Sequence, residues 1–86
     1  MPTVLRVDGF TFGFYANDHE PPHVHVFKGG SECKIVLSTL DIVNWGMKPA
    51  DLARAAAIVQ EHADELLVAW VRFHAAKGGS CEATAE

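Results

Sequence analysis

The segment from His19 to Val26 carries three imidazoles within a short stretch, in the order His19-Glu20-Pro21-Pro22-His23-Val24-His25-Val26. If its second half is a β-strand, His23 and His25 lie on the same side, with their Cβ atoms roughly 7 Å apart. Pro21-Pro22 stiffens the entry to that strand and removes two backbone donors. The pattern therefore indicates a pair of neighbouring imidazoles whose approach is fixed by the two prolines.

Paired imidazoles suit general acid–base catalysis, because histidine titrates near neutral pH. In RNA cleavage, a base takes the proton of the 2′-hydroxyl, an acid protonates the leaving oxygen, and a cation stabilises the charged phosphorane. The sequence does not say which of His23 and His25 would be the base. The candidates for the cation and for a further proton donor are Arg6, Lys28, Lys34 and Tyr15.

Metal binding is the second chemistry open to this segment, with zinc as the candidate ion. His23 and His25 would supply two ligands, and the third would come from His19, Asp18 or Glu20. The letters from His19 to His23 match the H-E-x-x-H metalloprotease motif, but that motif needs a helix, which the two prolines exclude. The plainest alternative is that the histidines are polar residues on a solvated strand face.

Strands must position this segment. Alternation with a period of two predicts strands over about 3–7, 10–15, 23–27 and 32–37, and residues 40–45 fit either a short strand or a short helix. Asp8-Gly9 is a hairpin signal, and Gly29-Gly30 marks a second turn. If the phenylalanines and valines of these strands face the core, His23, His25 and Phe27 face the opposite side.

An apolar stripe with alternating spacings of four and three residues runs from Leu52 to Phe73 and predicts one long helix over about 49–76. The stripe is wider than a coiled-coil seam, which favours packing on a sheet. The expected fold is therefore α+β, with a small antiparallel sheet of four or five strands packed on one C-terminal helix. Trp70 and Trp45 are expected in the core, with a partner or lid contact as the alternative for Trp45. His62 and His74 are expected on the surface.

Composition and charge fit an ordinary globular domain, since 86 residues are 49% hydrophobic and 21% charged, with a net charge of −4. We expect one domain over 1–77 and a disordered tail over 78–86. No signal peptide or membrane span is expected, and Cys33 and Cys81 read as free thiols, which together indicate a cytoplasmic protein. The charge balance excludes a broad basic surface, although a local RNA-cleaving site needs only a few cations.

Four stretches of the chain form a recognisable pattern: Pro2-Thr3-Val4-Leu5-Arg6, Phe12 to Tyr15, Asn17 to Val26, and Met47-Lys48-Pro49 with the helix up to Trp70. Through them the chain resembles the DUF4160 family of small bacterial proteins from residue 2 to about 74. It implies the toxin of a type II toxin–antitoxin pair, with a DUF2442-type antitoxin as partner. It also implies that His23 and His25 are the paired histidines needed for toxicity, while Arg6 and Tyr15 match the family pattern without a role. The acidic, alanine-rich helix and the Gly-Gly-Ser-Cys tail depart from the family.

The leading hypothesis is a toxin that cleaves RNA without a metal ion or other cofactor, using His23 and His25 as an acid–base pair. A protein-binding module without chemistry is the first alternative, and it would use the uncovered sheet face or a sheet edge. A zinc-binding domain with His19, His23 and His25 as ligands is the second. A homodimer is also open, because a chain of this size has a marginal core.

Overall fold

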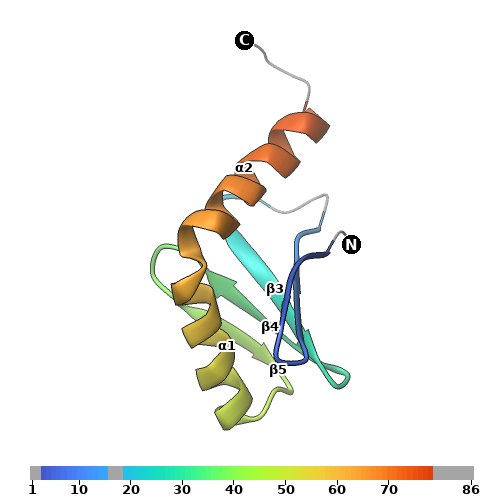
Figure 1. Ribbon diagram of the computed structural model, residues 1–86, viewed down its shortest axis with the longest axis vertical. Helices are drawn as coiled ribbons and strands as arrows, with labels where there is room; N and C mark the ends of the chain where they lie inside the picture. The colour runs from blue at the N-terminus through green and yellow to red at the C-terminus, as the bar shows by residue number, and fades with distance from the viewer. Residues whose placement is uncertain (1–2, 16–18, 79–86) are drawn as a thin grey trace.

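The computed structural model describes residues 3–15 and 19–78, which form an antiparallel sheet followed by two helices. The strands are β1 (Thr3–Val7), β2 (Phe10–Gly13), β3 (His23–Lys28), β4 (Ser31–Val36) and β5 (Ile42–Trp45), and they lie in the sheet in chain order. The helices are α1 (Pro49–Glu61) and α2 (Ala63–Gly78), which lie along one face of the sheet (Figure 1). The α+β fold predicted from the sequence is confirmed.

Tight turns explain why β1 pairs with β2 and why β3 pairs with β4. Asp8 and Gly9 both have positive φ, at 52° and 82°, and Gly29 and Gly30 have φ of 54° and 86°. Two consecutive residues with positive φ are typical of the type I′ hairpin, whose twist matches that of the flanking strands. The ambiguous stretch at residues 40–45 contains a strand, β5, which pairs with β4.

The core lies between the sheet and the helices. Its largest members are fully buried and come from alternate strand positions and from the inner helix faces: Phe10, Phe12, Phe14, Val24, Val26, Ile35, Ile58, Val59 and Leu66. Burying one such side chain contributes about 1.5–3 kcal/mol, so this layer is the main source of stability. Cys33 belongs to the same layer, and its burial, with a smaller effect of Glu32, raises the pKa of its thiol to about 11. Cys81 lies outside the described residues.

The predicted C-terminal helix is present, but it is divided at His62. This residue has φ −111° and ψ 19°, outside the helical range, while its N–H still donates to the carbonyls of Ile58 and Val59. The His62 carbonyl accepts from the N–H of Leu66 at 2.8 Å. Hydrogen bonding therefore passes through the junction while the axis bends, and both helices keep buried residues against the sheet (Figure 1).

The remaining sequence expectations concern the ends of the chain. Gly78 is the last residue of α2, and residues 79–86 of the predicted tail lie outside the described residues. In the described part of the chain, neither helix is long and apolar enough to cross a membrane.

Removing one methyl group from a buried isoleucine and, separately, from an exposed one tests the assignment of the core. Ile58 is fully buried, whereas Ile42 on β5 is 39% exposed. We expect Ile58→Val to lower the free energy of unfolding by about 0.5–1.5 kcal/mol, because it leaves a small cavity. The matched change Ile42→Val should cost less than about 0.5 kcal/mol. Urea unfolding followed by circular dichroism measures both, and equal losses would contradict this core.

Candidate functional site

Strand β3 sets the direction of the two histidines. It is hydrogen-bonded to β2 on one side and to β4 on the other, and Gly13 and Lys34 are the residues directly opposite His25. Val24 and Val26 are fully buried in the core, so the histidines that alternate with them project to the other face. The predicted alternation along this strand is therefore what the structure contains.

The imidazole of His23 is held from two sides. Its Nδ1 lies 2.8 Å from the carbonyl oxygen of Pro21, just after the cis Glu20–Pro21 peptide bond. Because a carbonyl oxygen can only accept, Nδ1 is the nitrogen that carries the proton, and in the neutral ring Nε2 carries the lone pair. The ring also contacts Trp70 of α2, with centroids 5.1 Å apart, and His25, with centroids 5.2 Å apart.

The imidazole of His25 has a carboxylate and an aromatic ring beside it. Its Nδ1 lies 3.3 Å from Oε2 of Glu32, and the Tyr15 ring contacts it edge-on, with centroids 4.4 Å apart. Sequence reasoning missed Glu32. The signal was available, because residue 32 shares the strand face of Lys34 once β3 and β4 are paired as a hairpin.

The alternative that these histidines are polar residues on a solvated strand face is contradicted. His23 and His25 are each only 7% exposed. Tyr15, which precedes β3 in the chain, lies against the ring of His25, and Trp70 of α2 lies against the ring of His23. Both imidazoles are therefore covered by other side chains, which argues against the interpretation that they are ordinary polar surface residues.

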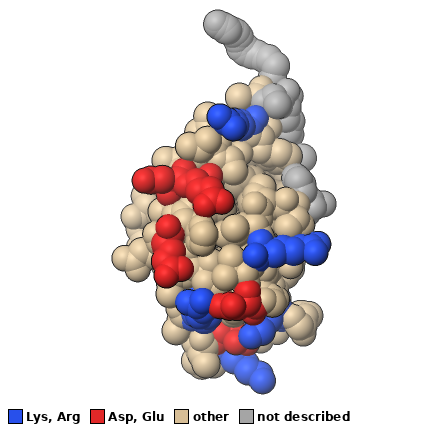
Figure 2. All heavy atoms as spheres, in the orientation of Figure 1, with Lys and Arg blue, Asp and Glu red and all other residues tan. Residues whose placement is uncertain are grey.

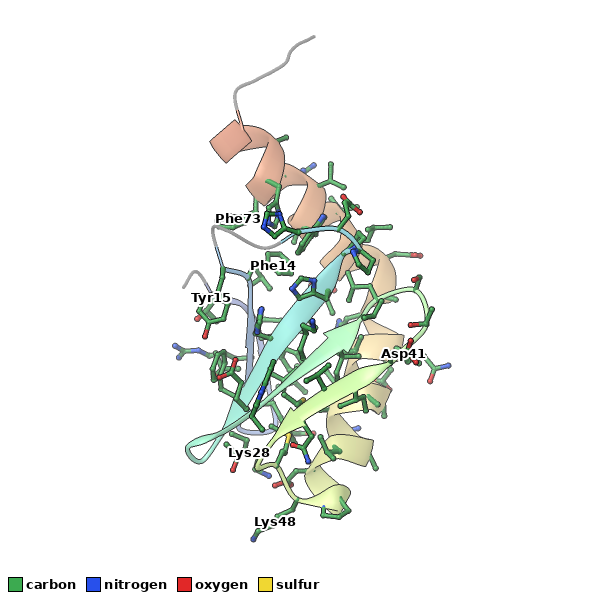
Figure 3. The ribbon with its side chains drawn as sticks, turned by 180° about the vertical axis from the view of Figure 1, so that it is seen from behind. Phe14, Tyr15, Lys28, Asp41, Lys48 and Phe73 are labelled. Atoms are coloured by element: carbon green, nitrogen blue, oxygen red, sulfur yellow. The ribbon has the colours of Figure 1, made fainter. Side chains whose placement is uncertain are left out.

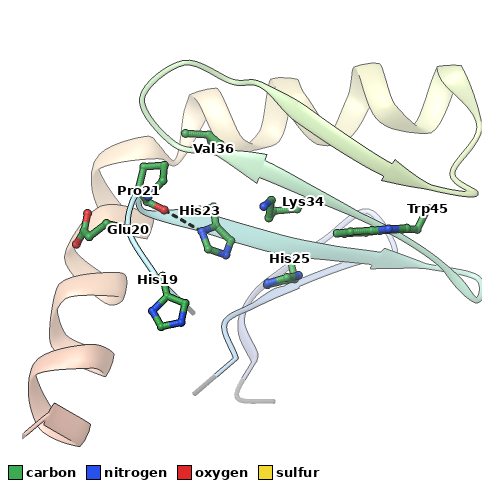
Figure 4. A pocket seen from close by; sticks show the side chains of 8 residues that line it. All are labelled: His19, Glu20, Pro21, His23, His25, Lys34, Val36 and Trp45. Atoms are coloured by element: carbon green, nitrogen blue, oxygen red, sulfur yellow. Dashed lines mark hydrogen bonds between the residues drawn. The ribbon is translucent and has the colours of Figure 1, made fainter. Parts of the chain in front are cut away.

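A groove of about 400 Å³ opens beside the pair. Figure 4 shows His19 and Glu20 at one end, Trp45 at the other, and Lys34 with the two buried histidines between them. Its lining residues are His19, Glu20, Pro21, His23, His25, Lys34, Val36 and Trp45. Trp45 was expected in the core, but it is 51% exposed because strand parity turns it to the groove face.

The candidate cations separate clearly. Lys34 lies directly opposite His25 and lines the groove. Lys28 points to the helix side, where its Nζ lies 3.3 Å from a carboxylate oxygen of Asp51 and 4.6 Å from the Phe10 ring centre. Arg6 is exposed on the edge strand β1, opposite Thr11, and does not line the groove. The structure thus brings Lys34 to the histidines, and not Lys28 or Arg6.

An aromatic cluster supports the site from the helix side. Trp70 lies edge-on to Phe14, with centroids 5.5 Å apart, and its ring centre is 3.8 Å from that of His74. His74, expected on the surface, is instead half-buried, and its Nδ1 donates to the Trp70 carbonyl at 2.9 Å. Figure 3 shows Phe14 beside Phe73 of α2, while Tyr15 points elsewhere. The cluster fixes the indole that contacts His23.

Charges around the site are mixed. Lys34 and Glu20 both line the groove, and a carboxylate oxygen of Glu32 lies 3.3 Å from Nδ1 of His25. On the helix side of the molecule, Figure 2 shows acidic and basic side chains interspersed. Within residues 3–15 and 19–78, no three histidine, cysteine or acidic side chains are grouped so that they could hold a metal ion. Asp18, one of the proposed metal ligands, lies outside the described residues.

A comparison with protein families finds a match over most of the chain. The family model described as a domain of unknown function, DUF4160, matches residues 9–71, which include β2 to β5, α1 and most of α2. No curated protein and no solved structure matches the chain.

The tautomer of His23 is a direct consequence of its contact with Pro21. In the neutral ring we expect the proton on Nδ1, because only Nδ1 faces the carbonyl oxygen at 2.8 Å. Long-range ¹H–¹⁵N correlation spectra at a pH where the ring is neutral measure this, with His23→Gln for assignment. A spectrum with the proton on Nε2 would contradict the described hydrogen bond.

Proposed function

The chain belongs to the DUF4160 family, described only as a domain of unknown function, and we propose that its histidine groove cleaves RNA without a metal ion. One observation carries the proposal. Two buried imidazoles, His23 and His25, share a groove of about 400 Å³ with the ammonium group of Lys34. These are the groups that phosphodiester cleavage by general acid–base catalysis requires.

In the proposed reaction, His25 takes the proton of the ribose 2′-hydroxyl, and the 2′-oxygen forms a bond to the adjacent phosphorus. The bond from phosphorus to the 5′-oxygen breaks, and His23, which enters the reaction as the imidazolium, gives a proton to that oxygen and becomes neutral. The products are a 2′,3′-cyclic phosphate and a 5′-hydroxyl, so no water, metal ion or oxidant is consumed. Lys34 stabilises the negative charge that develops on the phosphorane oxygens.

The assignment of the two histidines rests on their Nδ1 contacts. We propose that Glu32, whose Oε2 lies 3.3 Å from Nδ1 of His25, orients this ring as the general base. The Pro21 carbonyl does the same for His23 with a neutral acceptor. These contacts fix the orientation of each ring, which lowers the cost of orientation in the transition state.

In the cell we propose that the protein is the toxin of a type II toxin–antitoxin pair in the cytoplasm, neutralised by a DUF2442-type antitoxin. The support for a protein partner is strand β5, at an edge of the sheet, where Ile42 and Val43 are 39% and 44% exposed. An edge strand with exposed apolar side chains is suited to pairing with a strand of another chain. The same observation favours the second candidate function, a binding module without chemistry.

Substitution of the groove residues separates the two candidates. We expect His23→Ala and His25→Ala each to slow RNA cleavage by about 10²–10⁴-fold, since each removes one proton transfer. Lys34→Ala should also slow it, while the control variants His62→Ala and Lys48→Ala, away from the groove, should retain it. A fluorogenic RNA assay in EDTA measures the rates, and circular dichroism checks the fold. Folded histidine variants with undiminished cleavage would contradict the catalytic function.

Placing a lysine on β5 tests whether a protein partner binds at this edge strand. We expect Ile42→Lys to prevent co-purification of a co-expressed DUF2442-type protein, because a charge on an edge strand opposes strand pairing. The control Val68→Lys places the same charge on α2, where Val68 is 49% exposed, and should leave co-purification intact. RNA cleavage by the isolated Ile42→Lys variant should equal that of the wild type. Loss of the partner with Val68→Lys and not with Ile42→Lys would contradict binding at β5.

A further inference from the structure

Trp45 is the feature of the groove that acid–base chemistry does not use. Its indole is 51% exposed, although tryptophan is highly buried on average, and it lines the same groove as His25 and Lys34. We propose that Trp45 is a stacking platform for an unpaired base, so that the substrate class is single-stranded RNA. This inference rests on the proposed function, because it places the base beside the phosphate that the histidines would act on.

The backbone that carries this indole is anchored on both sides. The Asn44 side chain accepts from the Met47 N–H at 2.8 Å and donates to the Met47 carbonyl at 3.1 Å. The Ser31 hydroxyl donates to the Gly46 carbonyl at 3.1 Å, and Gly46 itself has a φ of 93°. The backbone that carries the indole is therefore held in place, which reduces the entropy lost on binding.

The register of the sheet places Trp45 within about the length of one nucleotide of the histidines. Lys34 lies opposite His25 on β3 and opposite Val43 on β5, so Trp45 is the diagonal neighbour of Lys34, at roughly 7–8 Å. Figure 4 shows the indole at one end of the groove, with Lys34 and His25 between it and His23. A base stacked on Trp45 thus leaves its phosphate at the ammonium and imidazole groups.

Charge explains why stacking is needed. The chain has a net charge of −4, and Lys34 is the lysine among the residues that line the groove, where Glu20 adds a negative charge. Contacts with phosphates cannot supply much affinity from one ammonium group, whereas stacking on an aromatic ring serves any unpaired base. Bases inside a duplex are already stacked and paired, so the platform selects single strands.

The test uses the full chain and a 2′-O-methyl oligouridylate, which lacks the attacking hydroxyl and is bound without being cut. We expect saturable quenching of tryptophan fluorescence that Trp45→Phe abolishes, which assigns the signal to Trp45 and not to Trp70, whose ring contacts His23. A duplex that contains the same strand should not quench. By fluorescence anisotropy of the labelled strand, Trp45→Ala should weaken binding on the order of tenfold or more. Trp45→Phe should retain part of the affinity, and the control Val68→Ala should retain all of it.

Three results would overturn the stacking role. These are wild-type affinity in Trp45→Ala, equal binding of duplex and single strand, and no binding of the single strand. The outcomes also separate the two proposals. Oligonucleotide binding that depends on Trp45, with no cleavage of unmodified RNA, would support stacking and remove only the catalytic function. Cleavage by Trp45→Ala at the wild-type rate and affinity would remove only the stacking role, and would leave Trp45 to a protein partner.

Discussion

Strand β3 is paired on both sides, and its register determines what the other residues of the site can do. A slip by one residue would move Val24 and Val26 to the open face and place both histidines in the core. The burial of the valines under the helices therefore holds His23 and His25 on the opposite face. The same register puts Lys34 opposite His25 and brings Trp45 to the same face. The hydrophobic core and the groove are thus two sides of one constraint.

Aromatic side chains cover both imidazoles. Tyr15, directly after β2, lies against His25, and Trp70 of α2 lies against His23. Each Nδ1 has a defined neighbour, the Pro21 carbonyl or the Glu32 carboxylate. Polar groups with little access to water need such partners, and the partners fix ring orientation. The result is a pair of imidazoles with defined positions beside a groove, which is the arrangement that an acid–base site requires.

Much of the fold could be predicted from the sequence, because the three phenylalanines, the valines of β3 and the helical stripe follow simple periods. The burial of the histidines could not be predicted, since it depends on how the Tyr15 ring turns toward His25 and on Trp70, which is distant in sequence from His23 and meets it only in the folded chain. The helix division at His62 has no sequence signal that we recognise. The position of Lys28 did have a sequence signal. Parity along β3 places residue 28 with the valines, on the helix side, and so apart from His23 and His25.

The central claim is that the histidine groove performs metal-independent transesterification, and the ends of the cleaved RNA report on it most directly. Purified protein is incubated with a single-stranded RNA in the presence of EDTA, and the masses of the fragments are measured by mass spectrometry. The proposed mechanism predicts a 2′,3′-cyclic phosphate on one fragment and a 5′-hydroxyl on the other, because the 2′-oxygen is the nucleophile. Fragments with a 5′-phosphate and a 3′-hydroxyl, or cleavage that EDTA abolishes, would contradict it.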